Sequence, residues 1–129
     1  MNSDTIHHNL SLPLELVCEN LGFPEGPVWM DDGSILLVEI RAKRLARVGP
    51  DGSYSVIAEI PGGPNGLAIG PDGAAYICNN GGMEFVDMPD GISVPVGAAS
   101  DYRGGSIQRV DLANGEVTTL FTHCDGLPL

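Results

Sequence analysis

The hydrophobic positions of the chain fall into short runs separated by turn signals, and none shows the spacing of a long amphipathic helix. Residues 35–38 are apolar without alternation, which predicts a strand buried on both faces. Residues 54–60 alternate instead, so that one predicted face carries Tyr54, Val56, Ala58 and Ile60. Asp-Gly pairs between such runs indicate hairpins, because glycine adopts positive φ at little cost. The pattern therefore predicts an all-β chain.

The strands predicted from these runs form two series of four. They span residues 26–30, 34–40, 44–48 and 54–60, and then 67–69, 75–78, 106–110 and 117–122. A partial alternation over residues 12–20 is compatible with one more strand. Residues 81–104 interrupt the pattern and predict a long loop rich in Gly, Pro and Asp. We interpret that loop as a lid or substrate rim, with simple surface variation as the alternative.

The two series begin with the same short motif, about forty residues apart. Residues 23–29 read Phe-Pro-Glu-Gly-Pro-Val-Trp, and residues 63–69 read Gly-Pro-Asn-Gly-Leu-Ala-Ile. In this alignment Glu25 falls on Asn65, and each unit continues into an Asp-Gly turn and an apolar strand. Four hairpin-linked strands in a repeat of this length are typical of the blade of a β-propeller.

This repeat predicts a flexible arm over residues 1–11 and a partial β-propeller over residues 12–129. The predicted boundaries are about 23–60 for the first blade, about 64–122 for the second blade with an insertion at about 81–104, and 123–129 for the start of the link to a third blade. Propellers close with about four to eight blades, and two blades alone expose large apolar faces. We therefore expect this chain to be the first part of a longer protein. The alternative is self-association through the exposed blade faces.

Composition narrows the classes of partner. The chain has 18 Gly and 10 Pro, as expected for a protein dense in turns. Its formal net charge of -11 argues against nucleic acid and anionic membrane surfaces as partners. The three cysteines form no Cys-x-x-Cys pair, which favours buried, reduced thiols. The first ten residues lack a basic start followed by an apolar core, so we expect no signal peptide and a cytoplasmic protein.

Glu25 is the strongest candidate for a functional side chain. It lies at the tip of a turn that leads into an innermost strand, where the starts of propeller blades converge on the central channel. One carboxylate with nearby amide oxygens makes a site for a hard cation such as Ca²⁺, Mg²⁺ or Mn²⁺. The alternative is a solvent-exposed turn glutamate.

Five further residues are candidates for substrate contacts or for the lining of the channel. They are Asn65, Asn79, Asn80, Tyr102 and Arg103. Asn65 is also a candidate metal ligand, and ordinary turn chemistry is the alternative explanation for the asparagines. We expect Trp29 to pack between blades and Cys78 to lie in the core. Glu39 and Arg41 are expected as charges at the rim.

These motifs resemble the SMP-30/gluconolactonase/LRE-like family over about residues 14–129. The resemblance rests on residues 23–29 with their Asp-Gly turn, and on residues 63–68, 78–82 and 101–107. It implies a six-bladed β-propeller, of which this chain covers about the first two four-stranded blades. It also implies one divalent metal cation in the central channel, with Ca²⁺ expected and Zn²⁺, Mg²⁺ or Mn²⁺ as alternatives. By resemblance, Glu25 matches the metal-binding glutamate of the first blade.

The resemblance further implies a hydrolase that opens lactones of sugar acids or cleaves related small esters, so the expected partner is a small molecule. The remaining metal ligands and the catalytic aspartate of the family are expected beyond Leu129. No catalytic residue is therefore assigned, and we expect the chain by itself to be inactive. Two other hypotheses are a propeller that serves as a non-catalytic binding scaffold and an inert fragment without a complete site.

Overall fold

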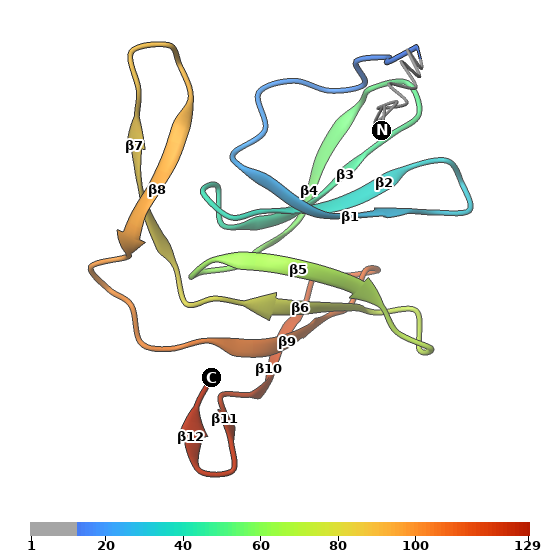
Figure 1. Ribbon diagram of the computed structural model, residues 1–129. Helices are drawn as coiled ribbons and strands as arrows, with labels where there is room; N and C mark the ends of the chain where they lie inside the picture. Colours follow the sequence, from blue (N-terminus) through green and yellow to red (C-terminus); the bar gives the residue numbers. More distant parts are fainter. Residues whose placement is uncertain (1–12) are drawn as a thin grey trace, which may run out of the picture.

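The computed structural model describes residues 13–129 as an all-β fold of antiparallel strands (Figure 1). Within this range the chain forms no helix, and hence no helix able to cross a membrane. The predicted arm at residues 1–11 lies outside the described residues. Residues 13–20, which were compatible with a strand, form none.

The first sheet is a four-stranded antiparallel meander. Its strands are β1 (Pro24–Trp29), β2 (Ile35–Glu39), β3 (Arg44–Val48) and β4 (Tyr54–Glu59), in that spatial order. Short turns join neighbouring strands, and Asp32-Gly33 forms the first of them with φ +80° at the glycine. The four strands predicted between residues 26 and 60 are thus confirmed, with some ends shifted.

The second sheet repeats this arrangement. Its strands are β5 (Pro64–Ile69), β6 (Ala75–Asn79), β9 (Ser106–Val110) and β10 (Val117–Phe121), in the order β10-β9-β6-β5. Because β9 pairs directly with β6, the second meander continues across a long excursion of the chain. A short hairpin of β11 (His123–Cys124) and β12 (Leu127–Pro128) follows.

The excursion between β6 and β9 is a hairpin rather than the loop predicted from its composition. It consists of β7 (Met83–Asp87) and β8 (Ser93–Ala98), and it stands away from the second sheet in Figure 1. At its tip the N–H of Gly91 donates to the carbonyl of Met88 at 2.9 Å, and Gly91 has φ +84°. Asp90-Gly91 is therefore the same hairpin signal that predicts the turns of the two sheets.

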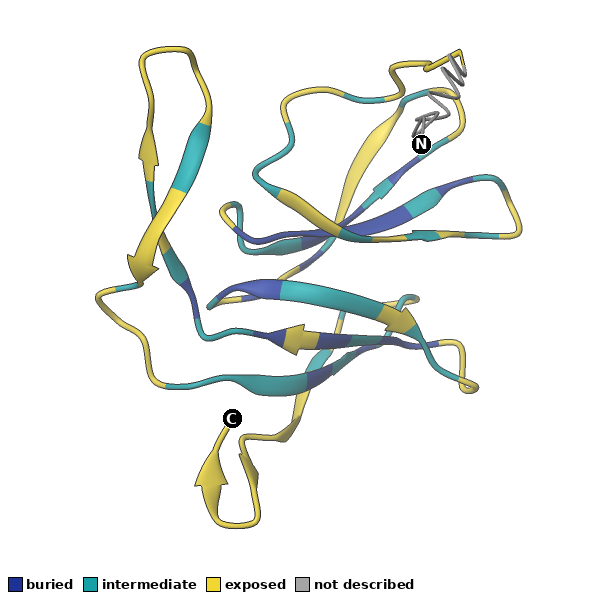
Figure 2. Ribbon diagram, in the orientation of Figure 1, coloured by how far each residue is buried: buried dark blue, intermediate teal, exposed yellow. Residues whose placement is uncertain are grey.

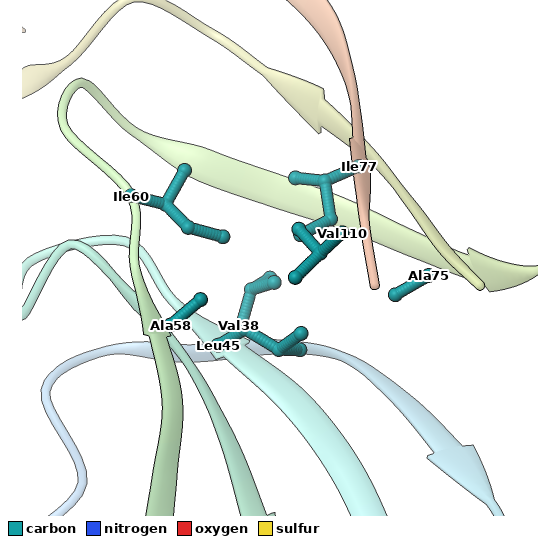
Figure 3. Packing of buried hydrophobic residues seen from close by; sticks show 7 residues of the cluster. All are labelled: Val38, Leu45, Ala58, Ile60, Ala75, Ile77 and Val110. Carbon is teal, nitrogen blue, oxygen red and sulfur yellow. The ribbon is translucent and has the colours of Figure 1, made fainter. Parts of the chain in front are cut away.

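The core lies between the two sheets, which stack face to face (Figures 1 and 3). Its buried residues are Val38, Leu45, Ala58 and Ile60 from the first sheet and Ala75, Ile77 and Val110 from the second. Side chains alternate along a strand, so Leu37 points to the opposite face of the first sheet, where Cys18 and Leu21 cover it. The strand β2 is thus buried on both faces, as predicted (Figure 2).

A bulge in β4 corrects the prediction that Tyr54, Val56, Ala58 and Ile60 share one face. Val56 pairs with Ala46, whereas Ala58 pairs with Leu45, so one residue of β4 is left over between them. The extra residue reverses the alternation. Ala58 therefore enters the core between the sheets, while Tyr54 turns toward the other face of the first sheet.

The core predicts a large difference between two isoleucines. Ile77 is 0% exposed and Ile92, near the hairpin tip, is 58% exposed. Ile77→Ala should lower the free energy of unfolding by about 2–5 kcal/mol, because it removes buried methyl groups and leaves a cavity. Ile92→Ala should change it by less than about 0.5 kcal/mol. Urea unfolding followed by circular dichroism measures both, and equal effects would contradict this description of the core.

Candidate functional site

Glu25 lies near the start of β1, at the end of the first sheet beside the hairpin β7–β8 (Figure 1). The chain reaches this point through Phe23 at φ +61° and leaves it through Gly26 at φ +55°. Pairing with β2 is interrupted by a bulge between Glu25 and Val28. The Glu25 side chain is exposed, and its Oε2 accepts a long hydrogen bond of 3.3 Å from the N–H of Gly26. The carboxylate is thus open to a ligand.

Asn65 occupies the corresponding place in β5. The pairing of β5 with β6 is interrupted between Pro64 and Gly66, so Asn65 lies in a bulge, whereas Glu25 pairs with Val38 and directly precedes the bulge of β1. The two bulges meet, because a Cβ placed on Gly26 would lie 3.2 Å from the carbonyl oxygen of Asn65. The structure therefore brings Glu25 and Asn65 to the same end of two adjacent strands.

Glu39 is buried, which corrects the prediction of a rim charge. Its side chain is 0% exposed at the end of β2. Arg44 donates to both carboxylate oxygens, at 2.9 Å from Nε and 3.3 Å from Nη2, and the Tyr54 hydroxyl and the Gly22 N–H each donate at 2.5 Å. Burial alone would raise the pKa of Glu39, but these hydrogen bonds outweigh it and lower that pKa. The carboxylate is thus held ionised inside the fold.

Asn79 corresponds to Glu39 in the second sheet and is also buried. Its Oδ1 accepts from the N–H of Gly63 at 2.8 Å and of Gly81 at 2.9 Å. Its Nδ2 donates to the carbonyl of Pro61 at 2.8 Å and to Oε1 of Gln108 at 3.0 Å. These four hydrogen bonds use all donors and acceptors of the amide. Asn79 therefore holds the surrounding chain in place and has no free group to offer a ligand.

The other predicted residues line two shallow hollows at the same end. Asn80 and Tyr102 border a hollow of about 250 Å³ between β6 and the base of the hairpin. Arg103 borders a second hollow of about 390 Å³, together with Asp101 and the buried Asn79. Tyr102 and Arg103 are both exposed. The six predicted residues thus gather at one end of the molecule, in three separate groups.

Arg41 fastens the hairpin to this end. Its guanidinium forms two hydrogen bonds with the carboxylate of Asp87 on β7, one of 2.9 Å from Nη2 to Oδ2, and it also donates to the hydroxyl of Ser93 on β8. The ring of Phe85 lies 5.0 Å from the ring of Phe23, centroid to centroid, and 5.9 Å from the Arg41 guanidinium carbon. Sequence reasoning missed this contact, because nothing local links residue 41 to residue 87. The hairpin therefore packs beside the segment that leads to Glu25.

The oxygen donors at this end fit a hard cation in kind but not in number. Glu25 offers a carboxylate and Asn65 an amide oxygen. Ca²⁺ takes about six to eight oxygen ligands. No cluster of three or more His, Cys, Asp or Glu residues suited to a metal occurs in residues 13–129. A cation at this end would therefore need further ligands from water or from other protein groups.

Trp29 lies at the opposite end of β1 and is 72% exposed, so it does not pack between the two sheets that residues 13–129 form. It pairs with Ile35, which places it on the face of the first sheet that the second sheet does not cover. Hollows of about 390 and 420 Å³ flank it. They are at least as large as the hollows beside Asn80 and Arg103, but none of the six predicted residues lines them.

The cysteines do not form the buried set that their spacing suggested. Cys78 and Cys124 are exposed, and Cys18 is half-buried. Cys78 alternates along β6 with Ile77, whose side chain enters the core, so Cys78 points away from the first sheet.

Comparison with known proteins agrees with the sequence resemblance. The sequence model of the family described as SMP-30/Gluconolactonase/LRE-like region matches residues 23–128. A gluconolactonase of Zymomonas mobilis is 28% identical over 87 residues, which cover 57% of this chain and 24% of that relative. The matched segment thus spans about a quarter of the relative's length.

The contact between Arg41 and Asp87 predicts how the hairpin responds to acid. Hydrogen bonds from Arg41 and Ser93 lower the pKa of Asp87 from 3.8 to about 2. Because the pKa is lowered in the folded state, this contact stabilises docking above pH 3.8 and is lost as the pH falls through about 2. A carboxyl titration by NMR should give a midpoint near 2 for Asp87, and Arg41→Gln should raise it toward 3.8. Lys43→Gln, which removes a neighbouring charge, is the control. An Asp87 midpoint of 3.8 in the unmodified chain would contradict the docked hairpin.

Proposed function

The chain belongs to the SMP-30/gluconolactonase/LRE-like family, and we propose that it is part of a metal-dependent hydrolase that opens lactone rings of sugar acids or cleaves related small esters. The name of the gluconolactonase relative supports this reaction class. The structural observation that carries the proposal is the open carboxylate of Glu25 directly before the bulge of β1, where Gly26 lies against Asn65 in the bulge of β5. No catalytic base is assigned among residues 13–129.

We further propose that the two sheets are the first blades of a six-bladed propeller. The alignment of the two repeats places Cys78 and Ile107 where the first sheet has Val38 and Leu45. The latter pair is buried under the second sheet, whereas Cys78 is exposed and Phe121, on the same face, is 60% exposed. A third sheet of the same repeat would cover this face. Self-association through that face is the alternative.

The proposed cation is Ca²⁺, held by Glu25 with Asn65 as a second oxygen donor. Oxygen-only donors favour Ca²⁺, Mg²⁺ or Mn²⁺ over Zn²⁺, which prefers nitrogen and sulfur ligands. When bound, the cation would polarise the substrate carbonyl and stabilise the oxyanion that forms when water attacks it. We expect residues 1–129 alone to be inactive, because their described part offers two of the roughly six to eight ligands required.

Tyr102 and Arg103 are proposed to contact the substrate at the rim. Both are exposed beside the hollows at the Glu25 end. The product of lactone opening carries a carboxylate, which a guanidinium binds through two parallel hydrogen bonds. The proposed substrate is a small molecule in the cytoplasm, and the net charge of -11 supports the absence of nucleic acid as a partner.

Glu25→Gln should weaken Ca²⁺ binding by the full-length protein by about tenfold or more, because a neutral amide replaces the charged ligand. Isothermal titration calorimetry measures the affinity. Glu116→Gln, an exposed glutamate in the turn between β9 and β10, is the matched control and should bind as the unmodified protein does. Unchanged Ca²⁺ affinity in the folded Glu25→Gln variant would contradict the proposal that Glu25 binds the metal.

Hydrolysis of a sugar-acid lactone tests the reaction class. Both the 129-residue chain and the product of the complete reading frame that contains it should be assayed. We expect activity of the full-length product to disappear with a chelator and to return with Ca²⁺. A full-length protein that binds Ca²⁺ but opens no lactone or ester would favour the non-catalytic scaffold.

A further inference from the structure

We propose that Glu39 is a positioning residue that fixes the backbone of residues 22–25 and thereby aims the carboxylate of Glu25, with Asn79 as its counterpart for Asn65. The role in ligand binding rests on the proposed function, whereas the hold on the backbone does not. Glu39 lies on a different strand from Glu25 and is fully buried, so it acts through the chain and not through contact with a ligand.

The segment before β1 has a backbone that needs external support. Phe23 has φ +61°, a backbone conformation that residues other than glycine rarely adopt. The N–H of Ile40 donates to the carbonyl of Phe23 at 3.0 Å, and the N–H of Arg41 donates to that of Gly22 at 3.1 Å. A Cβ on Gly22 would lie 2.5 Å from the Cβ of Ala42, so the segment lies directly on the turn after β2.

The side chain of Glu39 also supports this segment. Its Oε2 accepts the N–H of Gly22, and Arg44 and Tyr54 hold the carboxylate from the other side. A buried carboxylate is unfavourable unless charge and hydrogen bonds compensate for its lost hydration. Here Arg44 provides the charge and three groups provide hydrogen bonds, so the carboxylate is a fixed anchor for Gly22.

In the second repeat a buried asparagine, Asn79, takes the place of the buried carboxylate of Glu39. Glu39 pairs with Pro24 across β1 and β2, and Asn79 pairs with Pro64 across β5 and β6. Each therefore stands opposite the residue that precedes a candidate ligand, Glu25 or Asn65. Asn79 accepts the N–H of Gly63, which lies one position later in the repeat than Gly22, the residue whose N–H Glu39 accepts.

The backbone contacts of the two anchors also coincide. The N–H of Asn80 donates to the carbonyl of Gly63 at 2.8 Å, just as Ile40 donates to Phe23 in the first repeat. Asn79 is neutral and finds its remaining partners in Pro61 and Gln108, so it needs no counterion. A buried polar residue thus anchors the entry to the innermost strand in both repeats.

Glu39→Gln tests the proposal in the full-length protein. Each oxygen of Glu39 accepts at least one N–H, from Arg44 at Oε1 and from Gly22 and Arg44 at Oε2, so an amide NH₂ at either position must face an N–H donor. We expect amide hydrogen exchange of Gly22, Phe23 and Glu25 to accelerate by about tenfold and Ca²⁺ affinity to fall by about tenfold, as for other residues that orient a ligand. Glu59→Gln is the control, because Glu59 is exposed on β4 and pairs with Arg44 without anchoring Gly22.

A double-mutant cycle separates positioning from general destabilisation. If Glu39 acts through Glu25, Glu39→Gln should have no further effect on Ca²⁺ affinity in the Glu25→Gln background. Equal losses in both backgrounds, or unchanged exchange of residues 22–25 in the folded variant, would overturn the proposal. If Glu39→Gln does not fold, Tyr54→Phe removes a single donor and should accelerate the same amides. No acceleration in Tyr54→Phe would overturn the proposal.

The two proposals fail in different ways. If Glu25→Gln leaves Ca²⁺ affinity unchanged, the metal assignment fails and with it the ligand-aiming role of Glu39. The exchange rates of residues 22–25 still decide whether Glu39 anchors the backbone. If Glu25→Gln weakens Ca²⁺ binding but Glu39→Gln changes neither affinity nor exchange, only the positioning role is wrong.

Discussion

The packing of the two sheets against each other is the interaction on which the rest of the structure depends. Each sheet is a meander that cannot bury its own apolar side chains, and residues such as Leu45 and Ile77 leave water only when the sheets stack. The stack also places β1 beside β5, so that Gly26 lies against Asn65. The burial that stabilises the fold therefore also brings the two candidate oxygen donors to one end of the molecule.

Polar groups inside this fold are tolerated because each has partners. Glu39 and Asn79 are among its buried polar residues, and within the described range no buried side-chain nitrogen or oxygen lacks a hydrogen bond. An unpartnered buried acceptor would cost about 1–3 kcal/mol or more. The same hydrogen bonds that avoid this cost tie the entries of β1 and β5 to the ends of β2 and β6. Stability and the geometry of the candidate site thus depend on the same contacts.

The hairpin β7–β8 packs beside that site, against Phe23 and Arg41. An exposed ion pair such as Arg41–Asp87 contributes little to stability because water screens it, so the contact between Phe23 and Phe85 also holds the hairpin in place. Phe23 is held by its backbone hydrogen bond from Ile40 as well. One residue therefore joins the hairpin, the turn after β2 and the segment that carries Glu25.

The sequence alone determined the eight strands of the two sheets, the turns within them and the correspondence of Glu25 and Asn65 in the repeat, but it did not determine the hairpin β7–β8. The features that it determined are local or repeated, because alternation, Asp-Gly pairs and a repeat can be read without knowing what packs where. It did not determine which face of each strand is covered. Glu39 therefore resembles a rim charge until the tertiary structure buries it, and Cys78 resembles a core residue although its face of β6 is open within residues 13–129. The partners of Glu39 come from three separate segments, and only folding brings Tyr54 and the others to its carboxylate. Burial is a property of neighbouring surfaces, and the tertiary structure alone decides which surfaces become neighbours.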